Sequence, residues 1–155
     1  MISKKYRAFS FVEMIIIVLF LGIFAAISVP RLNRAAISKN RAQAVARKIV
    51  ADLRLTRRLA ITDAANNTMG FELKMVGTVP YTSYKIENVK TLATVATHII
   101  DSGVGISCPT GIRFIFGPLG NLKVGSGTEI IVSAEGKSFT ITVVQATGTV
   151  KCSEN

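Results

Sequence analysis

The first third of the chain contains an apolar block with the length of a membrane-spanning helix. Residues 9–29 are a run of 21 residues whose only charge is Glu13, and Lys4, Lys5 and Arg7 precede the run. A helix over this run would be about 31 Å long, at about 1.5 Å per residue, which is enough to cross the hydrocarbon layer of a membrane. The pattern predicts a single-pass transmembrane helix, with the cationic N-terminus inside and the rest of the chain outside.

Three simpler interpretations of this run stay open. In the first, it is a secretory signal peptide that is cleaved near the small residues Ala26 and Ser28. In the second, it is an ordinary membrane anchor, which leaves Glu13 without a role although an acidic residue in a spanning helix costs about 2.5 to 3.5 kcal/mol. In the third, it is a buried core helix, which a run of this length disfavours in so small a protein.

After Pro30 the pattern becomes that of an amphipathic helix. Residues 31–64 contain no Gly or Pro, and Val45, Ile49 and Leu53 recur at four-residue spacing, which makes an apolar stripe. We expect Pro30 to bend the helix without ending it, and the stripe to pack on a globular head. The opposite face carries nine cations against Asp52 alone: Arg31, Arg34, Lys39, Arg41, Arg47, Lys48, Arg54, Arg57 and Arg58.

From residue 65 onward, short stretches rich in β-forming residues predict strands. They cover residues 69–75, 81–87, 92–100, 112–116, 129–133, 138–144 and 147–151. The sequence Ala134-Glu135-Gly136-Lys137 predicts a tight hairpin between the fifth and sixth of these. The predicted fold class is therefore α+β, with a long N-terminal transmembrane and amphipathic helix packed on an antiparallel β-sheet head.

The residues at the start of the chain form a specific combination. A short basic leader ends in the small residue Ala8, Phe9 follows, Glu13 would be the fifth residue of a chain cut between them, and Gly22 and Pro30 weaken the helix. This combination resembles the leader and helix of type IV pilins and type II secretion pseudopilins, although Ala8 stands where most of that family has Gly. The resemblance implies cleavage by a prepilin peptidase between Ala8 and Phe9, and N-methylation of Phe9.

Cleavage would create a cationic amine on Phe9, one helical turn from Glu13. In an apolar environment an unpaired charge costs far more than a hydrogen-bonded pair, so the two groups can neutralise each other within a subunit or between neighbours. The resemblance implies that Glu13 sets the register with the N-terminus of the next subunit. Glu13, Gly22 and Pro30 are therefore the expected assembly residues.

The second half of the chain carries a looser resemblance. Leu53, Arg58, Ala60 and Ile61, the segment at 114–121, and the closing residues 148–150 are similar to the head of GspH/FimT minor pilins. The resemblance implies a pilin-like fold with four parts. These are a leader peptide (1–8), a transmembrane and filament-core helix (9–29), an amphipathic helix that continues into the head (30–64) and a β-rich globular head (65–155).

The charge of the chain is strongly positive. The formal net charge is +10, and removal of the three leader cations would leave +7. The basic helix face is either solvated, or contacts lipid headgroups, acidic neighbouring subunits or nucleic acid. The candidate residues for contact with DNA or an acidic partner are Arg47, Lys48, Arg54, Arg57 and Arg58. Because residues 31–64 include no aromatic side chain for base stacking, such DNA binding would consist mostly of phosphate contacts.

The remaining chemistry is sparse. A bridge between Cys108 and Cys152 would close a loop of about 45 residues and add roughly 4 kcal/mol in the chain-entropy interpretation. Many pilins staple their C-terminal region in this way, and two unpaired thiols are the alternative. His98 stands without a close acidic partner in the sequence and is expected to be structural rather than a metal ligand. With no triad, paired carboxylates or metal cluster, we expect no enzymatic activity, no metal and no cofactor.

The predicted function is that of a structural subunit, a minor pilin or pseudopilin of a type II secretion or type IV pilus filament. The expected partners are a prepilin peptidase, other pilins of the filament and the cytoplasmic (inner) membrane. The expected location is that membrane, with the head on the outer, periplasmic side, and afterwards the filament. The alternative is a DNA-binding minor pilin for uptake in natural transformation, which the nearly neutral tail at 151–155 disfavours.

Overall fold

The computed structural model describes residues 10–155, and within its helix it describes the side chains of 11–26 and 39–62. The helix is α1 (Phe11–Thr62). Eight strands follow it: β1 (Phe71–Val76), β2 (Ser83–Asn88), β3 (Thr94–Ile99), β4 (Gly105–Ser107), β5 (Arg113–Phe116), β6 (Glu129–Ala134), β7 (Lys137–Val144) and β8 (Thr149–Glu154). The chain divides into two compact units, Met1–Ile37 and Ser38–Asn155, so that α1 contributes to both.

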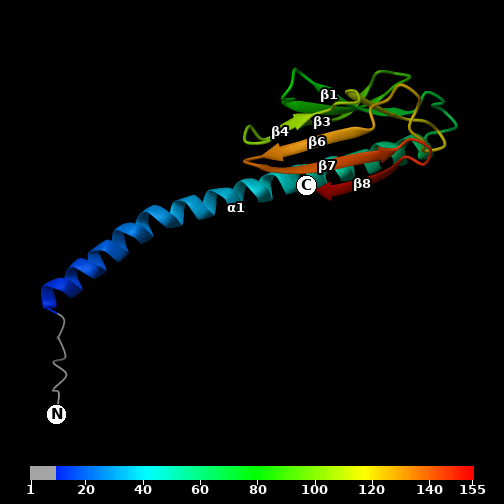
Figure 1. Ribbon diagram of the computed structural model, residues 1–155. Coiled ribbons are helices and arrows are strands. Elements are labelled where there is room, and N and C mark those ends of the chain that lie inside the picture. Colours follow the sequence, from blue (N-terminus) through cyan, green and yellow to red (C-terminus); the bar gives the residue numbers. More distant parts are fainter. Residues whose placement is uncertain (1–9) are drawn as a thin grey trace, which may run out of the picture. The chain divides into compact units, whose positions relative to one another are not determined.

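The strands form two antiparallel sheets within the unit Ser38–Asn155 (Figure 1). One sheet has the order β3-β2-β1-β5 and the other the order β4-β6-β7-β8. The hairpin between β6 and β7 pairs Ala134 with Lys137, as predicted. Glu135 and Gly136 form its turn with φ values of 41° and 80°, which is the left-handed geometry of a type I′ turn.

The core of this unit is built from the alternation of the strands and the apolar stripe of the helix. In β7 the side chains of Phe139, Ile141 and Val143 are buried, at the two-residue period of a strand with one covered face. Ile49 and Leu53 of α1 are completely buried in the same cluster. The prediction that this stripe packs on the β-rich part of the chain is therefore confirmed.

The predicted fold class is wrong. We expected one long transmembrane and amphipathic helix packed on a single antiparallel sheet. The unit Ser38–Asn155 is instead mostly sheet, with eight strands in two sheets, and it includes only the part of α1 that follows residue 37. The helical side chains in its core extend from Ala42 to Ala60. The physical reason is that both sheets contribute buried apolar side chains, such as Leu73 and Phe114 of one and Ile130 and Ile141 of the other, so the two sheets share a core.

Each of the seven predicted strands is present, with ends that differ from the prediction by three residues or fewer. The strand that the sequence did not predict is β4 (Gly105–Ser107), which pairs with β6. It is three residues long and only Ile106 is apolar, so no alternation can be recognised in it. Its place in the sheet depends on the longer partner strand, which is a tertiary effect.

Candidate functional sites

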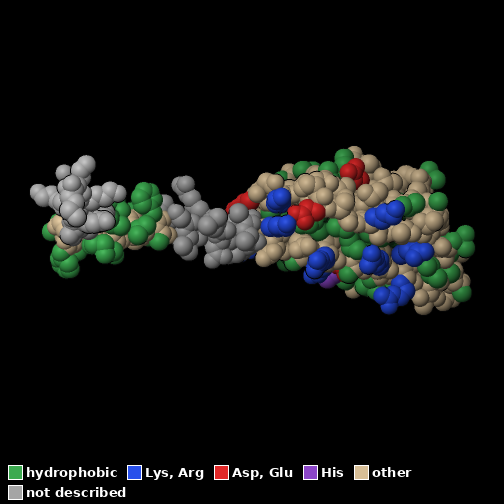
Figure 2. Space-filling view, turned by 60° about the horizontal axis from the view of Figure 1, so that its bottom comes forward, with side chains coloured by type: hydrophobic (Ala, Val, Ile, Leu, Met, Phe, Trp, Pro, Cys, Tyr) green, Lys and Arg blue, Asp and Glu red, His purple; other side chains and the backbone are tan. Residues whose placement is uncertain are grey.

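The N-terminal part of α1 presents an apolar surface to solvent. Every side chain in residues 11–26 is exposed, and the exposed fraction reaches 80% at Phe11 and 66% at Phe24. Figure 2 shows hydrophobic side chains covering this stretch. The Ser10 carbonyl accepts hydrogen bonds from the N–H groups of Glu13 and Met14, so the helix begins immediately after Ser10. A contiguous exposed apolar surface of this kind marks an interaction site.

The predicted processing and assembly residues lie in or beside this stretch. Ala8 and Phe9 lie outside the residues that the structure describes. Glu13 is exposed in the first turn of α1, where the positive end of the helix dipole favours a carboxylate. A Cβ added to Gly22 would meet no heavy atom of the described residues within 4 Å, so no contact with them requires a glycine there. Pro30 falls within α1, but its side chain is outside those described.

The prediction of a transmembrane helix, and with it the assignment to the cytoplasmic (inner) membrane, is wrong. Across the described residues, no helical stretch combines the length and the apolar character that crossing a membrane requires.

The basic face of α1 is only partly neutralised. Lys39 pairs with Glu154 at 2.7 Å, and the Arg41 guanidinium lies 4.0 Å from a carboxylate oxygen of Asp101. Within the described part of the chain, the five cations that we predicted as contacts for DNA or an acidic partner have no carboxylate at ion-pair distance: Arg47, Lys48, Arg54, Arg57 and Arg58. Figure 2 shows Lys and Arg side chains gathered on one face of this unit.

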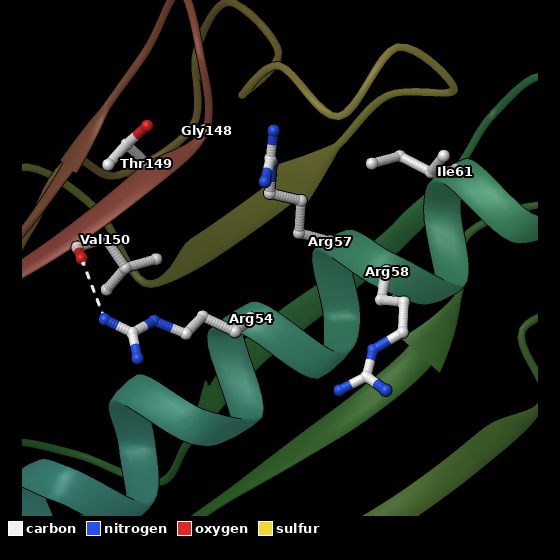
Figure 3. Close-up of a pocket in the computed structure, with 7 residues that line it drawn as sticks. All are labelled: Arg54, Arg57, Arg58, Ile61, Gly148, Thr149 and Val150. Atoms are coloured by element: carbon white, nitrogen blue, oxygen red, sulfur yellow. Dashed lines mark hydrogen bonds between the residues drawn. The ribbon is translucent and has the colours of Figure 1, made fainter.

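Three of these arginines line a pocket of about 410 Å³ (Figure 3). Arg54, Arg57 and Arg58 come from successive turns of α1, and the segment 148–150 forms the opposite wall. The Arg57 Nε donates to the Gly120 carbonyl at 3.0 Å, and the Arg54 Nη2 donates to the Val150 carbonyl at 3.4 Å. The pocket therefore combines a concave surface with several guanidinium groups, an arrangement that suits an anionic ligand.

Asp52, the single anion of the basic face, is not paired with the arginines. It accepts a hydrogen bond of 2.6 Å from the Tyr84 hydroxyl, and the His98 Nε2 lies 3.4 Å from the same carboxylate oxygen. The rings of Tyr84 and His98 are in tilted contact, with their centroids 5.2 Å apart. His98 therefore has an acidic partner that its neighbours in the sequence did not indicate, because this partner comes from α1 and is 46 residues away along the chain.

This cluster makes stability depend on pH in the alkaline range. Burial, followed by the hydrogen bond to Asp52, raises the pKa of Tyr84 above its usual range. The unfolded chain loses the phenolic proton near pH 10 while the folded chain keeps it. The contribution of protonated Tyr84 to the free energy of unfolding is therefore complete below about pH 10 and is lost as the pH rises further. We expect the free energy of unfolding to fall between pH 9 and pH 11, and to fall less in Tyr84→Phe. Urea denaturation at several pH values measures both slopes, and equal slopes would contradict the assignment.

A second buried carboxylate was not recognised from the sequence. Only 3% of the Glu72 side chain is exposed, and Arg113 binds it with two hydrogen bonds of 2.7 and 3.1 Å. These hydrogen bonds raise the pKa of the Arg113 guanidinium. Glu72 lies opposite Ile115 on the paired strands β1 and β5. The only indication in the sequence was that the charged residue Glu72 follows Phe71 within a predicted strand.

Of the two alternatives that the sequence left open for Cys108 and Cys152, the structure has the unpaired one, since both are free thiols. Cys108 follows β4 at one edge of its sheet, and Cys152 lies in β8 at the other edge. Three strand spacings of about 4.8 Å separate these edges by about 14 Å, whereas bridged Cα atoms lie about 4.4 to 6.8 Å apart. Burial raises the pKa of the Cys108 thiol to about 12, while Cys152 is exposed.

Comparison with protein families, with curated proteins and with solved structures finds no match to this chain. Among the described residues there is also no group of three or more His, Cys, Asp or Glu side chains placed to hold a metal ion. The candidate sites are therefore the exposed apolar helix surface at 11–26 and the arginine pocket, and both rest on their own geometry.

Proposed function

We propose that this protein is a structural subunit of a type II secretion or type IV pilus filament, a minor pilin or pseudopilin. In this proposal a prepilin peptidase cleaves the chain between Ala8 and Phe9, Phe9 is N-methylated, and subunits assemble through their N-terminal helices. The observation that carries the proposal is the exposed apolar surface of residues 11–26.

Physical chemistry supports an interior role for this surface. A helix that is apolar on all sides is stable only when something covers it. Burying one large apolar side chain contributes about 1.5 to 3 kcal/mol, and the stretch holds many of them, including Phe11, Phe20 and Phe24. Further copies of the same kind of helix offer a matching surface. Gly22, with open space around it, would allow the backbones of neighbouring helices to approach closely.

Cleavage is the first step that the proposal requires. We expect the intact mass of the chain purified from filament-producing cells to correspond to a chain that begins at Phe9, with one added methyl group. A peptidase that closes on an extended backbone needs a small side chain beside the scissile bond, so Ala8→Leu is expected to leave the chain uncut. A mature chain that begins at Met1 or at Val29 would contradict the proposal.

A further inference from the structure

The arginine pocket contains guanidinium groups that are held in place before any ligand arrives. Arg57 is fixed by the Gly120 carbonyl and Arg54 by the Val150 carbonyl, and each bond uses only one of the five N–H groups that a guanidinium carries. Figure 3 shows Arg54 reaching toward Val150 and Arg57 extending toward Gly148, whereas Arg58 extends away from both. Preorganised donors lose less conformational entropy on binding than free side chains do.

Two glycines create the space that the Arg57 guanidinium occupies. A Cβ on Gly148 would lie 1.9 Å from the Gly120 carbonyl oxygen and 3.1 Å from the Arg57 Nε. A Cβ on Gly120 would lie 2.7 Å from a methyl carbon of Ile61 and also 3.1 Å from the Arg57 Nε. Both glycines have positive φ, 64° and 77°, which other residues adopt at a cost. The wall of the pocket is therefore shaped closely around a guanidinium.

The pocket carries positive charge that the described residues do not balance. None of the ion pairs in the described part of the chain includes Arg54, Arg57 or Arg58, although Arg57 is half-buried. The hydroxyl of Thr147 donates to the hydroxyl of Thr149 at 2.8 Å, which leaves the Thr149 proton available as a further donor. The guanidinium groups of Arg54 and Arg57, together with this hydroxyl, suit an oxyanion with several acceptor oxygens.

We propose that this pocket binds a phosphate group, through the guanidinium groups of Arg54 and Arg57 and the Thr149 hydroxyl. Phosphate fits better than a carboxylate because a phosphate monoester carries nearly two negative charges against these two cations and offers three acceptor oxygens. The phosphate can be a free ion or a monoester, or it can belong to the backbone of a nucleic acid. The binding site does not depend on the proposed filament role.

The test uses the full chain, kept in detergent because of its exposed apolar helix, and inorganic phosphate as the probe. We expect calorimetry to detect phosphate binding and to detect no comparable binding of acetate at the same ionic strength. Arg54→Ala is expected to weaken phosphate binding about tenfold, since a charge-assisted hydrogen bond is lost. This variant keeps the fold, because Arg54 is exposed and its hydrogen bond to the Val150 carbonyl is long, at 3.4 Å. Arg57→Ala is a second variant with the same expected direction.

Lys48→Ala is the matched control, because Lys48 is an exposed cation of the same helix that does not line the pocket. Its phosphate affinity is expected to change less than twofold. A single-stranded oligonucleotide then identifies the source: displacement of phosphate by the oligonucleotide indicates a nucleic acid backbone, and no displacement indicates a free phosphate or monoester. The proposal is overturned if phosphate does not bind, if acetate binds equally well, or if Lys48→Ala and Arg54→Ala have the same effect.

Discussion

Glu13→Gln is expected to reduce incorporation of the protein into filaments at least tenfold while leaving the chain folded. In the proposed filament, the carboxylate neutralises the N-terminal amine of Phe9 inside a core of packed helices. Without it, one amine per subunit is an unpaired charge in an apolar environment, which costs several kcal/mol, and each 1.4 kcal/mol corresponds to a factor of ten. Gln keeps the size of the side chain, so packing is preserved.

Immunoblotting of sheared filaments, normalised to the cellular amount of the protein, measures this effect. Glu135→Gln is the matched control, because Glu135 is an exposed carboxylate in the β6–β7 turn and lies far along the chain from the helix. The control is expected to assemble normally. If Glu13→Gln assembles as well as the unchanged protein, Glu13 has no role in assembly.

Arg113→Ala is expected to lower the free energy of unfolding by about 2 to 3 kcal/mol. Removing the guanidinium leaves the nearly inaccessible Glu72 carboxylate without its partner, and breaking a fully buried pair in this way costs about 3 to 5 kcal/mol. The expected loss is smaller because 47% of the Arg113 side chain is exposed, so water can reach the carboxylate from that side. Urea denaturation at neutral pH measures the loss.

The double variant Glu72→Gln with Arg113→Ala separates the unpaired charge from the lost contacts. If the uncompensated carboxylate causes the loss, neutralising it recovers at least half of the free energy. A double variant that is as unstable as Arg113→Ala would instead assign the effect to the packing of the Arg113 side chain between β1 and β5.

The sequence predicted the β-rich half of the chain well for a physical reason. In strands such as β7, every second side chain is apolar, and burial of one face produces that alternation directly. The β6–β7 turn was predicted from four residues because Gly136 permits the left-handed backbone that a two-residue hairpin needs. The prediction failed at β4, whose three residues form a strand only because β6 pairs with them.

The division of these strands between two sheets was not predictable from the sequence. Alternation states which side chains are buried but not which strand lies beside which, so two sheets and one sheet give the same pattern. The pairing of the cysteines was left open for the same reason, since the sequence does not show that Cys108 and Cys152 lie at opposite edges of one sheet. A transmembrane segment was inferred from the length of the apolar run and the cations before it, and no helix in the described part of the chain fulfils that inference.

Some features of the candidate sites were likewise visible in the sequence, whereas others appeared only in the folded structure. The sequence by itself determined that Glu13 lies in an apolar helical stretch and that residues 31–64 carry many cations beside an apolar stripe, because helical periodicity is a local property. Only the tertiary structure decided which of those cations are neutralised and which line a pocket with Gly148 and Thr149, about ninety residues further along the chain. Likewise, only folding brings Tyr84 and His98 to Asp52. Contacts between distant segments depend on how sheets and helix pack, and no local pattern records that packing.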